Sequence, residues 1–480
     1  MPPAKPPHDA NPESSRVLAV LVGVQLPGVT EADHASDLAE LGRLVHTLGF
    51  EVAATITQRR DSLAAGAVLG EGKLRELAAL TGGRGDVPSG APEVKTKARA
   101  RWAEAGRDGD AEVDDDDDDD DDDDRDAGGS DARDGSDGPL RPTVVVVDHE
   151  ISPSQARNLE RATGARVLDR TGVIVDIFHR HARSREARLE VEIARLNYVA
   201  PRMRESSGGK ERQRGKGAGE AAIELDRRKI RDRIAELREQ LAAIQKEQEN
   251  RRQARHDQLR VALVGYTNAG KSSLMRALTG SQVLVEDKLF ATLDTTVRAL
   301  QPETKPRVLV SDTVGFIKKL PHDLVASFRS TLAEALEASL LLYVVDAADP
   351  AHAAQLEVTR QVLREIGADA VPSRLILNKA DRLDEPARAA LLRAYASDGP
   401  MIVSAQDPAD VARVRSEVLA FFEASMVEEK LLVPYAKQGL LGEVYENARV
   451  VAEEYDEIGT HLTVRGLPAA VARLRRAFEG

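Results

Sequence analysis

Short apolar runs alternate with segments of helical spacing along most of the chain. Residues 17–23 form a continuous apolar run, which predicts a buried strand, and residues 38–48 then carry leucine and valine at the three- and four-residue spacing of a helix. Further strand-type runs follow at 51–57 and 144–147. Strands that alternate with helices favour a parallel sheet, so we expect a small N-terminal α/β domain over residues 16–180.

The pattern changes after residue 180. Two stretches carry apolar residues at alternating spacings of three and four, which is the heptad-type pattern of helices that pack along a seam. The residues between them, 205–220, are rich in Gly, Lys and Arg. We therefore expect an antiparallel helical hairpin over residues 181–257, with a Gly-rich basic loop at 205–220.

The α/β alternation returns near residue 258. Apolar strand candidates are separated mostly by helical segments and lie at 260–264, 308–311, 340–345, 375–377 and 401–403. They predict a central domain over residues 258–427 with a mostly parallel sheet and flanking helices. Residues 428–480 predict a small C-terminal α/β unit, so the predicted fold class is α/β multidomain.

Charge is distributed unevenly and changes the interpretation of the composition. The formal net charge is −13, but residues 81–140 alone hold 8 Lys and Arg against 21 Asp and Glu, including an unbroken run from Asp114 to Asp124. The rest of the chain is therefore neutral overall, and residues 180–260 carry 22 basic against 14 acidic side chains. We interpret 81–140 as a disordered acidic insertion within the N-terminal domain, and residues 1–15 as a disordered tail.

The composition also excludes several classes of protein. Without any cysteine, the chain cannot form disulfides, thiolate nucleophiles or cysteine-based zinc sites. The segment from Met1 to Ser15 lacks the apolar core of a secretory signal. No apolar run reaches the roughly 20 residues that a membrane-spanning helix needs. We expect a soluble cytoplasmic protein with no membrane span, and a monomer in solution.

A phosphate-binding sequence lies at the start of the central domain. Residues 265–272 read Gly-Tyr-Thr-Asn-Ala-Gly-Lys-Ser, follow an apolar strand and precede a helix that begins near Ser273. Glycines let the backbone amides converge on phosphate, and the helix N-terminus adds positive potential. Lys271 can reach the β- and γ-phosphates, and the Ser272 hydroxyl can bind Mg²⁺. The candidate phosphate-binding residues are Gly265, Tyr266, Thr267, Asn268, Ala269, Gly270, Lys271, Ser272 and Ser273.

A second sequence predicts which base is bound. Asn378-Lys379-Ala380-Asp381 follows the strand candidate at 375–377. A carboxylate at Asp381 can accept hydrogen bonds from N1–H and the exocyclic amine of guanine, whereas adenine would leave it unpaired. Ser404 and Ala405 follow the strand candidate at 401–403 and fit a further loop beside the guanine edge.

A third sequence lies between these two. Asp312-Thr313-Val314-Gly315 ends the strand candidate at 308–311 and places Asp312 near Mg²⁺ and the Gly315 amide near the γ-phosphate. Thr292, Thr295 and Thr296 are the candidates for a further Mg²⁺ ligand. The residue after Gly315 is Phe316, which cannot orient water as glutamine does in Ras-type enzymes. We therefore expect slow hydrolysis that a partner accelerates.

Together these segments resemble the HflX family of ribosome-associated GTPases. The resemblance rests on the phosphate-binding sequence, on Leu289-Phe-Ala-Thr-Leu-Asp294 and on Asp312-Thr-Val-Gly-Phe-Ile317. Within the N-terminal domain it also rests on segments at 70–73, 152–160 and 169–172. The resemblance implies that Thr292 is the switch-I threonine, next to Phe290 and Ala291 at the nucleotide. The implied catalytic residues are Lys271, Thr292 and Gly315, and the implied Mg²⁺ ligands are Ser272, Thr292 and Asp312.

The resemblance also implies a function. Members of this family bind the large ribosomal subunit and its RNA, split stalled or idle ribosomes, and hydrolyse GTP to GDP and phosphate when the ribosome stimulates them. An excess of Lys and Arg around a Gly-rich hairpin loop is typical of RNA-binding segments. The alternative is a nucleotide-gated RNA-binding or ribosome-assembly factor that does not split ribosomes.

Overall fold

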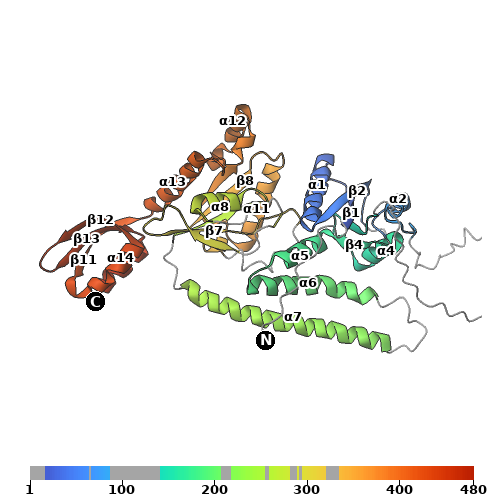
Figure 1. Ribbon diagram of the computed structural model, residues 1–480, viewed down its shortest axis with the longest axis horizontal. Coiled ribbons are helices and arrows are strands. Elements are labelled where there is room, and N and C mark those ends of the chain that lie inside the picture. Colours follow the sequence, from blue (N-terminus) through green and yellow to red (C-terminus); the bar gives the residue numbers. More distant parts are fainter. Residues whose placement is uncertain are drawn as a thin grey trace, which may run out of the picture.

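The computed structural model describes residues 17–63, 66–86, 141–206, 218–253, 259–281, 289–290, 295–319 and 334–479. An N-terminal unit lies beside a central unit, and a small C-terminal unit projects from the far side of the central one (Figure 1). Two long helices run below the N-terminal unit, and the longer one extends below part of the central unit in this view. Each of the three units has its own sheet. The predicted α/β multidomain fold is confirmed.

The N-terminal sheet is wholly parallel, in the order β2-β1-β3-β4. Its strands are β1 (Val17–Gln25), β2 (Phe50–Arg59), β3 (Val144–Val147) and β4 (Arg166–Asp169), and its helices are α1 (Glu31–Thr47), α2 (Glu71–Thr81), α4 (Pro153–Thr163) and α5 (Arg170–His181). All four valines of β3 are buried, as expected for a strand covered on both faces. Strand β4 was not predicted, because only two of its four residues are apolar.

The predicted acidic insertion falls largely outside the described residues, which omit 87–140. Its first part does belong to the folded unit: α2 includes Thr81, and the Gly85 amide donates a hydrogen bond of 2.9 Å to the carbonyl of Ala162 at the end of α4. Helix α4 begins with a capping box between Ser152 and Gln155. The cap fixes the start of this helix, because it satisfies amides that have no partner within the helix.

The predicted helical hairpin is present as α6 (Arg185–Ser206) and α7 (Ala218–Gln253), which pack against each other. The loop between them is shorter than the predicted 205–220, because helix continues to Ser206 and resumes at Ala218, where alanine and glutamate favour it. Residues 207–217 lie outside the described part of the chain. Helix α6 also packs on α4 and α5, so the hairpin is joined to the N-terminal unit (Figure 1).

One buried carboxylate anchors α6 to the N-terminal sheet. Asp169, at the end of β4, is inaccessible to solvent and accepts hydrogen bonds from the Tyr198 hydroxyl at 2.8 Å and from Arg202 at 2.5 Å. The Arg202 guanidinium also lies over the Tyr198 ring, 3.6 Å from its centre. The pKa of Tyr198 is raised by burial and by Asp169, which keeps its hydroxyl a donor.

The central sheet has the order β10-β9-β8-β5-β7-β6, and only the β6–β7 pair is antiparallel. Its strands are β5 (Leu259–Val264), β6 (Thr296–Ala299), β7 (Val308–Asp312), β8 (Leu340–Asp346), β9 (Ser373–Asn378) and β10 (Met401–Ile402). Its helices are α8 (Lys271–Thr279), α11 (His352–Ile366), α12 (Glu385–Ala394) and α13 (Pro408–Ala424), with 3₁₀ turns η2 (Ala380–Arg382) and η3 (Ala396–Asp398). Strand β6, with only two apolar residues, was not predicted.

The C-terminal unit is an antiparallel sheet, β11-β13-β12, covered by helices. It contains β11 (Val427–Pro434), η4 (Tyr435–Leu440), α14 (Leu441–Asn447), β12 (Ala448–Tyr455), β13 (Gly459–Gly466) and α15 (Pro468–Glu479). Strand β11 begins at Val427, one residue before the predicted boundary. Across the described ranges of all three units, no helix combines the length and the apolar character needed to cross a membrane.

The Asp169 anchor generates a prediction about stability. Replacing Arg202 by Ala leaves a solvent-inaccessible carboxylate without its cation, so we expect the free energy of unfolding to fall by about 2 kcal/mol in urea titrations. The control is Arg195→Ala on the same helix, because Arg195 is exposed and pairs only loosely with Glu192, at 3.7 Å. Equal stability losses in the two variants would contradict the anchoring role of Arg202.

Candidate guanine nucleotide site

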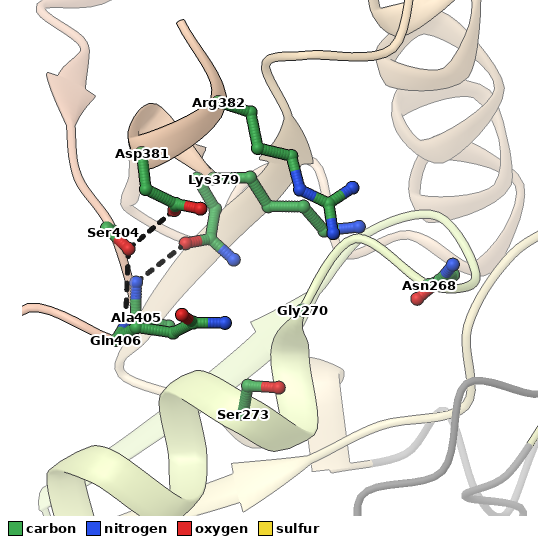
Figure 2. A pocket seen from close by; sticks show the side chains of 10 residues that line it. Asn268, Gly270, Ser273, Lys379, Asp381, Arg382, Ser404, Ala405 and Gln406 are labelled. Atoms are coloured by element: carbon green, nitrogen blue, oxygen red, sulfur yellow. Dashed lines mark hydrogen bonds between the residues drawn. The ribbon is translucent and has the colours of Figure 1, made fainter.

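The residues singled out in the central domain meet at one edge of its sheet. Strands β5, β7, β8, β9 and β10 run parallel, so the loops after them converge where their carboxyl ends meet. A cavity of about 330 Å³ opens there (Figure 2). Its lining comes from the phosphate-binding loop and from the two predicted base loops: Asn268, Gly270, Ser273, Asn378, Lys379, Asp381, Arg382, Ser404, Ala405 and Gln406.

The phosphate-binding loop joins β5 to α8, which begins at Lys271. Gly270 has a φ of +94°, and a Cβ atom there would lie 2.2 Å from the Asn378 amide nitrogen. Only glycine therefore fits this turn, and the close approach brings the loop against the end of β9. Helix α8 starts directly after Gly270, so its N-terminus lies at the loop, which is the arrangement that binds anions at helix N-termini.

Lys271 is buried beneath the loop. Its ammonium group donates hydrogen bonds to the carbonyls of Gly265 at 3.0 Å and Tyr266 at 2.8 Å. Burial lowers the pKa of Lys271 to about 8, against the opposing effect of the Asp312 carboxylate. The lysine therefore sits at the base of the loop, where a bound phosphate would favour its charged form.

Two side chains that can supply oxygen ligands to a metal ion lie next to each other between the loop and β7. The Ser272 hydroxyl donates a hydrogen bond of 2.6 Å to Asp312, the last residue of β7, which is inaccessible to solvent. A hydroxyl and a carboxylate are the ligand types that Mg²⁺ prefers, so the residues present fit this ion. Thr292 and Ala291 lie outside the described residues.

The structure does not bring every predicted residue into the cavity. The Phe290 side chain is buried and packs edge-on against Phe178 of α5, with the ring centres 4.6 Å apart. The Tyr266 hydroxyl turns toward the N-terminal unit, where it contacts Glu40. The Thr313 hydroxyl donates to the Leu263 carbonyl at 2.7 Å, and Val314 is buried. The Phe290 ring remains in the core because the cavity would expose it to water. The Tyr266 and Thr313 hydroxyls already have hydrogen-bond partners there.

The base loops are joined by side-chain hydrogen bonds (Figure 2). Asn378 donates to the Ala269 carbonyl at 2.9 Å and accepts from the Ala405 amide at 3.0 Å, which ties the phosphate-binding loop to both base loops. The Ser404 hydroxyl donates to Asp381 at 2.6 Å. These bonds leave the other Asp381 oxygen available for a ligand, and Asp381 as a whole is exposed.

Two lining residues were missed in the sequence. Arg382 and Gln406 each directly follow a predicted base-loop residue, and this adjacency is the only signal that could have identified them. Figure 2 shows the Lys379 and Arg382 side chains extending over the phosphate-binding loop, and Lys379 also pairs with Asp346 of β8 at 2.7 Å. The arrangement as a whole suits a guanine base beside Asp381 and phosphates at the loop.

Three sequence families match successive parts of the chain. One described as "GTP-binding GTPase N-terminal" matches residues 35–85 and 139–179, and "GTP-binding GTPase Middle Region" matches residues 181–255. One described as "50S ribosome-binding GTPase" matches residues 260–379. The matches follow the order of the N-terminal unit, the hairpin and the central unit.

Individual relatives agree with these families. A protein named GTPase HflX from Gluconacetobacter diazotrophicus is 65% identical over 461 residues, which cover 96% of this chain and 98% of the relative. The GTPase HflX of Magnetococcus marinus is 42% identical over 343 residues, covering 70% and 79% of the two chains. The solved structure of an SsGBP–GDP complex aligns over 85% of this chain and 98% of its own, at 20% identity and a TM-score of 0.46. The family assignment rests on the sequence matches.

The base contact can be tested by substitution. Asp381→Asn replaces one carboxylate oxygen, a hydrogen-bond acceptor, with an amide NH2 group, which is a donor. We therefore expect GDP affinity to fall by about 10²-fold or more and xanthosine diphosphate affinity to rise. The measurement is a competition titration with a fluorescent nucleotide. Asp384→Asn is the matched control, because Asp384 caps the following helix α12 and does not line the cavity. An unchanged guanine preference in Asp381→Asn would contradict the assigned contact.

The lowered pKa of Lys271 predicts a pH dependence of binding. Above about pH 8 the free protein loses the Lys271 proton, whereas bound phosphate favours the charged form, so binding then takes up a proton. We expect GDP affinity to fall by up to about tenfold between about pH 7 and about pH 9. Lys271→Arg stays charged and reports any ionisation of the nucleotide itself. Parallel pH profiles for the two proteins would exclude Lys271 as the titrating group.

Proposed function

The chain belongs to the HflX family of GTPases, so its reaction is the hydrolysis of GTP to GDP and phosphate, and we propose that this reaction serves to dissociate ribosomes. In this proposal the protein binds the large ribosomal subunit, with its ribosomal RNA as the principal contact, and separates stalled or idle ribosomes into subunits. The family description "50S ribosome-binding GTPase" for residues 260–379 supports a ribosomal partner.

The observation that carries the proposal is the basic helical hairpin. Residues 180–260 hold 22 Lys and Arg against 14 Asp and Glu, in a chain whose formal net charge is −13. On α7 the exposed side chains include Arg228, Arg231, Arg233 and Arg238, while Leu237 is buried against the rest of the protein. A pair of long helices with surplus positive charge suits a phosphate backbone, because binding releases condensed counterions.

The nucleotide site supplies the chemistry for a switch. Ser272 and Asp312 would hold Mg²⁺, with Thr292 as the proposed third protein ligand, and the ion would neutralise charge on the transferred phosphoryl group. Lys271 would bind the β- and γ-phosphates, and the Gly315 amide would contact the γ-phosphate. Loss of that phosphate on hydrolysis would release the segment after Gly315.

The residue after Gly315 supports stimulation by a partner. Phe316 is buried, with 2% of its surface exposed, and lies in the apolar core between the N-terminal and central units. A buried phenyl ring can neither donate nor accept a hydrogen bond from the attacking water. We therefore expect slow hydrolysis by the isolated protein, and we propose that the ribosome stimulates it.

Sedimentation of ribosomes separates the proposed function from its alternative. Intact ribosomes are incubated with the protein and a non-hydrolysable GTP analogue and then centrifuged through a sucrose gradient. We expect intact ribosomes to convert to separate subunits, with the protein on the large subunit. Binding to RNA or to precursor particles without loss of intact ribosomes would instead indicate an assembly factor.

A matched pair of variants assigns the activity to the hairpin. Neutralising Arg212, Arg214 and Lys216 to Gln removes charge from the hairpin loop, and we expect subunit separation to be lost while nucleotide affinity is kept. The control neutralises Arg473, Arg475 and Arg476, which are exposed on α15 of the C-terminal unit. Equal splitting by both variants would exclude the hairpin loop as the ribosomal contact.

A further inference from the structure

Each of the two base loops is bound by a charged side chain of the helix that follows it. Arg388 of α12 donates a hydrogen bond of 2.8 Å to the Ala380 carbonyl, within the Asn378–Asp381 segment. Asp410 of α13 accepts a hydrogen bond of 2.7 Å from the Ser404 amide, in the second loop. Hydrogen bonds with one charged partner are stronger than neutral ones, so each helix fixes the backbone of the loop that precedes it.

Asp410 lies in the first turn of α13, which begins at Pro408 after the cap residue Asp407. An acid at this position commonly stabilises the helix N-terminus or binds the amide of the cap residue. Here the Asp407 amide already donates to the Ser404 carbonyl at 3.0 Å, and the Asp410 carboxylate reaches six residues back to the Ser404 amide. The Asp410 side chain is 19% exposed, so water screens this bond only in part.

Arg413, one turn further along α13, supports the Asp410 carboxylate. Its guanidinium donates to Asp410 and also to the Ile402 carbonyl, the latter at 2.8 Å. Ile402 is the last residue of β10, so this arginine joins the helix to the end of the strand. Asp410 therefore has partners on two sides, and turning away from Ser404 would also break its ion pair with Arg413.

Every polar group of Ser404 has a hydrogen-bond partner, and most of these partners belong to the first residues after it. The amide donates to Asp410, the carbonyl accepts from the Asp407 amide, and the hydroxyl accepts from the Gln406 amide at 3.2 Å. Ser404 is also 5% exposed, so its position is set by the start of α13. Its remaining hydrogen bond leaves this segment, because the hydroxyl donates to Asp381 at 2.6 Å (Figure 2).

The orientation of Asp381 depends on the bond from Ser404. Asp381 is exposed, and a short side chain in water samples several rotamers. A hydrogen bond from a buried hydroxyl selects one of them and keeps the carboxylate at the wall of the cavity, which both residues line. A group held in its binding orientation raises affinity, because less conformational entropy is lost when the ligand binds.

The other residue that contacts this loop is held independently of α13. Asn378 ends β9, donates to the Ala269 carbonyl and accepts from the Ala405 amide at 3.0 Å. Loss of the Asp410 contact would therefore leave Ala405 bound to Asn378 while Ser404 lost one of its supports. The expected consequence is a specific one: the loop stays at the pocket, but the hydroxyl that orients Asp381 is no longer fixed.

We propose that Asp410 is a positioning residue for guanine recognition: it holds Ser404, whose hydroxyl then fixes Asp381 at the guanine edge. Arg413 supports Asp410 in this role. The inference rests on the assignment of Asp381 to guanine N1–H and the exocyclic amine. Asp410 does not line the cavity and acts through Ser404, so base selectivity depends partly on a residue outside the pocket.

A purely local role for Asp410 makes a different requirement. A carboxylate in the first turn interacts favourably with the helix dipole, and in that role it would stabilise α13 without affecting the base. The dipole requires negative charge, whereas the Ser404 amide requires an acceptor oxygen. Asparagine supplies the oxygen without the charge, so Asp410→Asn separates the two roles.

The test compares affinities for GDP and for inosine diphosphate, which keeps N1–H but lacks the exocyclic amine, by competition with a fluorescent nucleotide. Asp410→Leu has no acceptor for the Ser404 amide, so we expect GDP affinity to fall at least about fivefold. Inosine diphosphate should lose less than about twofold, because a single bond to N1–H tolerates more orientations of the carboxylate than two bonds do. Asp410→Asn should keep the wild-type ratio of the two affinities.

The ratio also makes the test independent of folding, because a partly unfolded fraction lowers the apparent affinity for both nucleotides equally. Equal losses for the two nucleotides in Asp410→Leu, or no loss, would overturn the proposal. A ratio that falls as far in Asp410→Asn as in Asp410→Leu would also overturn it, in favour of the helix dipole. Asp407→Ala is the matched control, because Asp407 caps the same helix through the Ala409 amide at 2.9 Å, and it should keep the ratio.

A double-mutant cycle tests transmission through Ser404. Ser404→Ala removes the hydroxyl that binds Asp381, so we expect it to lower the ratio by itself. Adding Asp410→Leu to Ser404→Ala should then change the ratio no further, because the connection is already broken. Additive effects of the two substitutions would exclude Ser404 as the link.

Asp381→Asn distinguishes a failure of this inference from a failure of the base assignment. If Asp381→Asn reduces the preference for guanine and Asp410→Leu does not, the base contact stands and the role of Asp410 is excluded. If Asp381→Asn leaves the preference unchanged, the assignment of Asp381 is wrong and the role of Asp410 is excluded with it. None of these measurements involves ribosomes, so their outcome is separate from that of the proposed ribosomal role.

Discussion

The arrangement of the N-terminal and central units depends on the guanidinium of Arg170. A permanently charged group that is 2% exposed requires compensating anions, and Glu40 and Asp148 provide them. Burial opposes the charge of Arg170, but these two carboxylates outweigh it and raise the pKa of the guanidinium. The same group also binds the Lys318 carbonyl, so charge compensation within one unit fixes the backbone of the other.

The nucleotide site follows from a different constraint, the direction of parallel strands. Loops after β5, β7, β9 and β10 meet because these strands end at the same edge of the sheet. Asn378 then joins three of the loops through two hydrogen bonds, to Ala269 and Ala405. The shape of the base pocket is therefore set by one amide side chain together with the sheet.

The sequence was most informative where function requires residues close together in the chain. The phosphate-binding loop and the Asn378–Asp381 segment were predicted because each is a continuous sequence beside an apolar strand. Strands β4 and β6 were missed because each is four residues long with two apolar residues, too few for a pattern. Periodicity thus predicted the sheet interiors better than their edges.

The charged residues between the N-terminal and central units could not be predicted in the same way, because they lie far apart in the chain: Asp37 and its partner Lys318 are 281 residues apart. A weak signal did exist in α1. Asp37 and Glu40 lie on the same helical face as Leu41 and Leu44, so two acids interrupt a stripe that should be apolar. Buried acids on such a stripe indicate a cationic partner, but only the tertiary structure identifies it.

Because α7 is long, a small rotation of this helix moves its far end a considerable distance. With 36 residues at 1.5 Å each, this helix is about 54 Å long. Tilting a rod of that length by about 6° about one end moves the other end by about 5 Å, roughly one helical turn. A small rotation of the hairpin relative to the N-terminal unit would therefore move its far end by several ångströms.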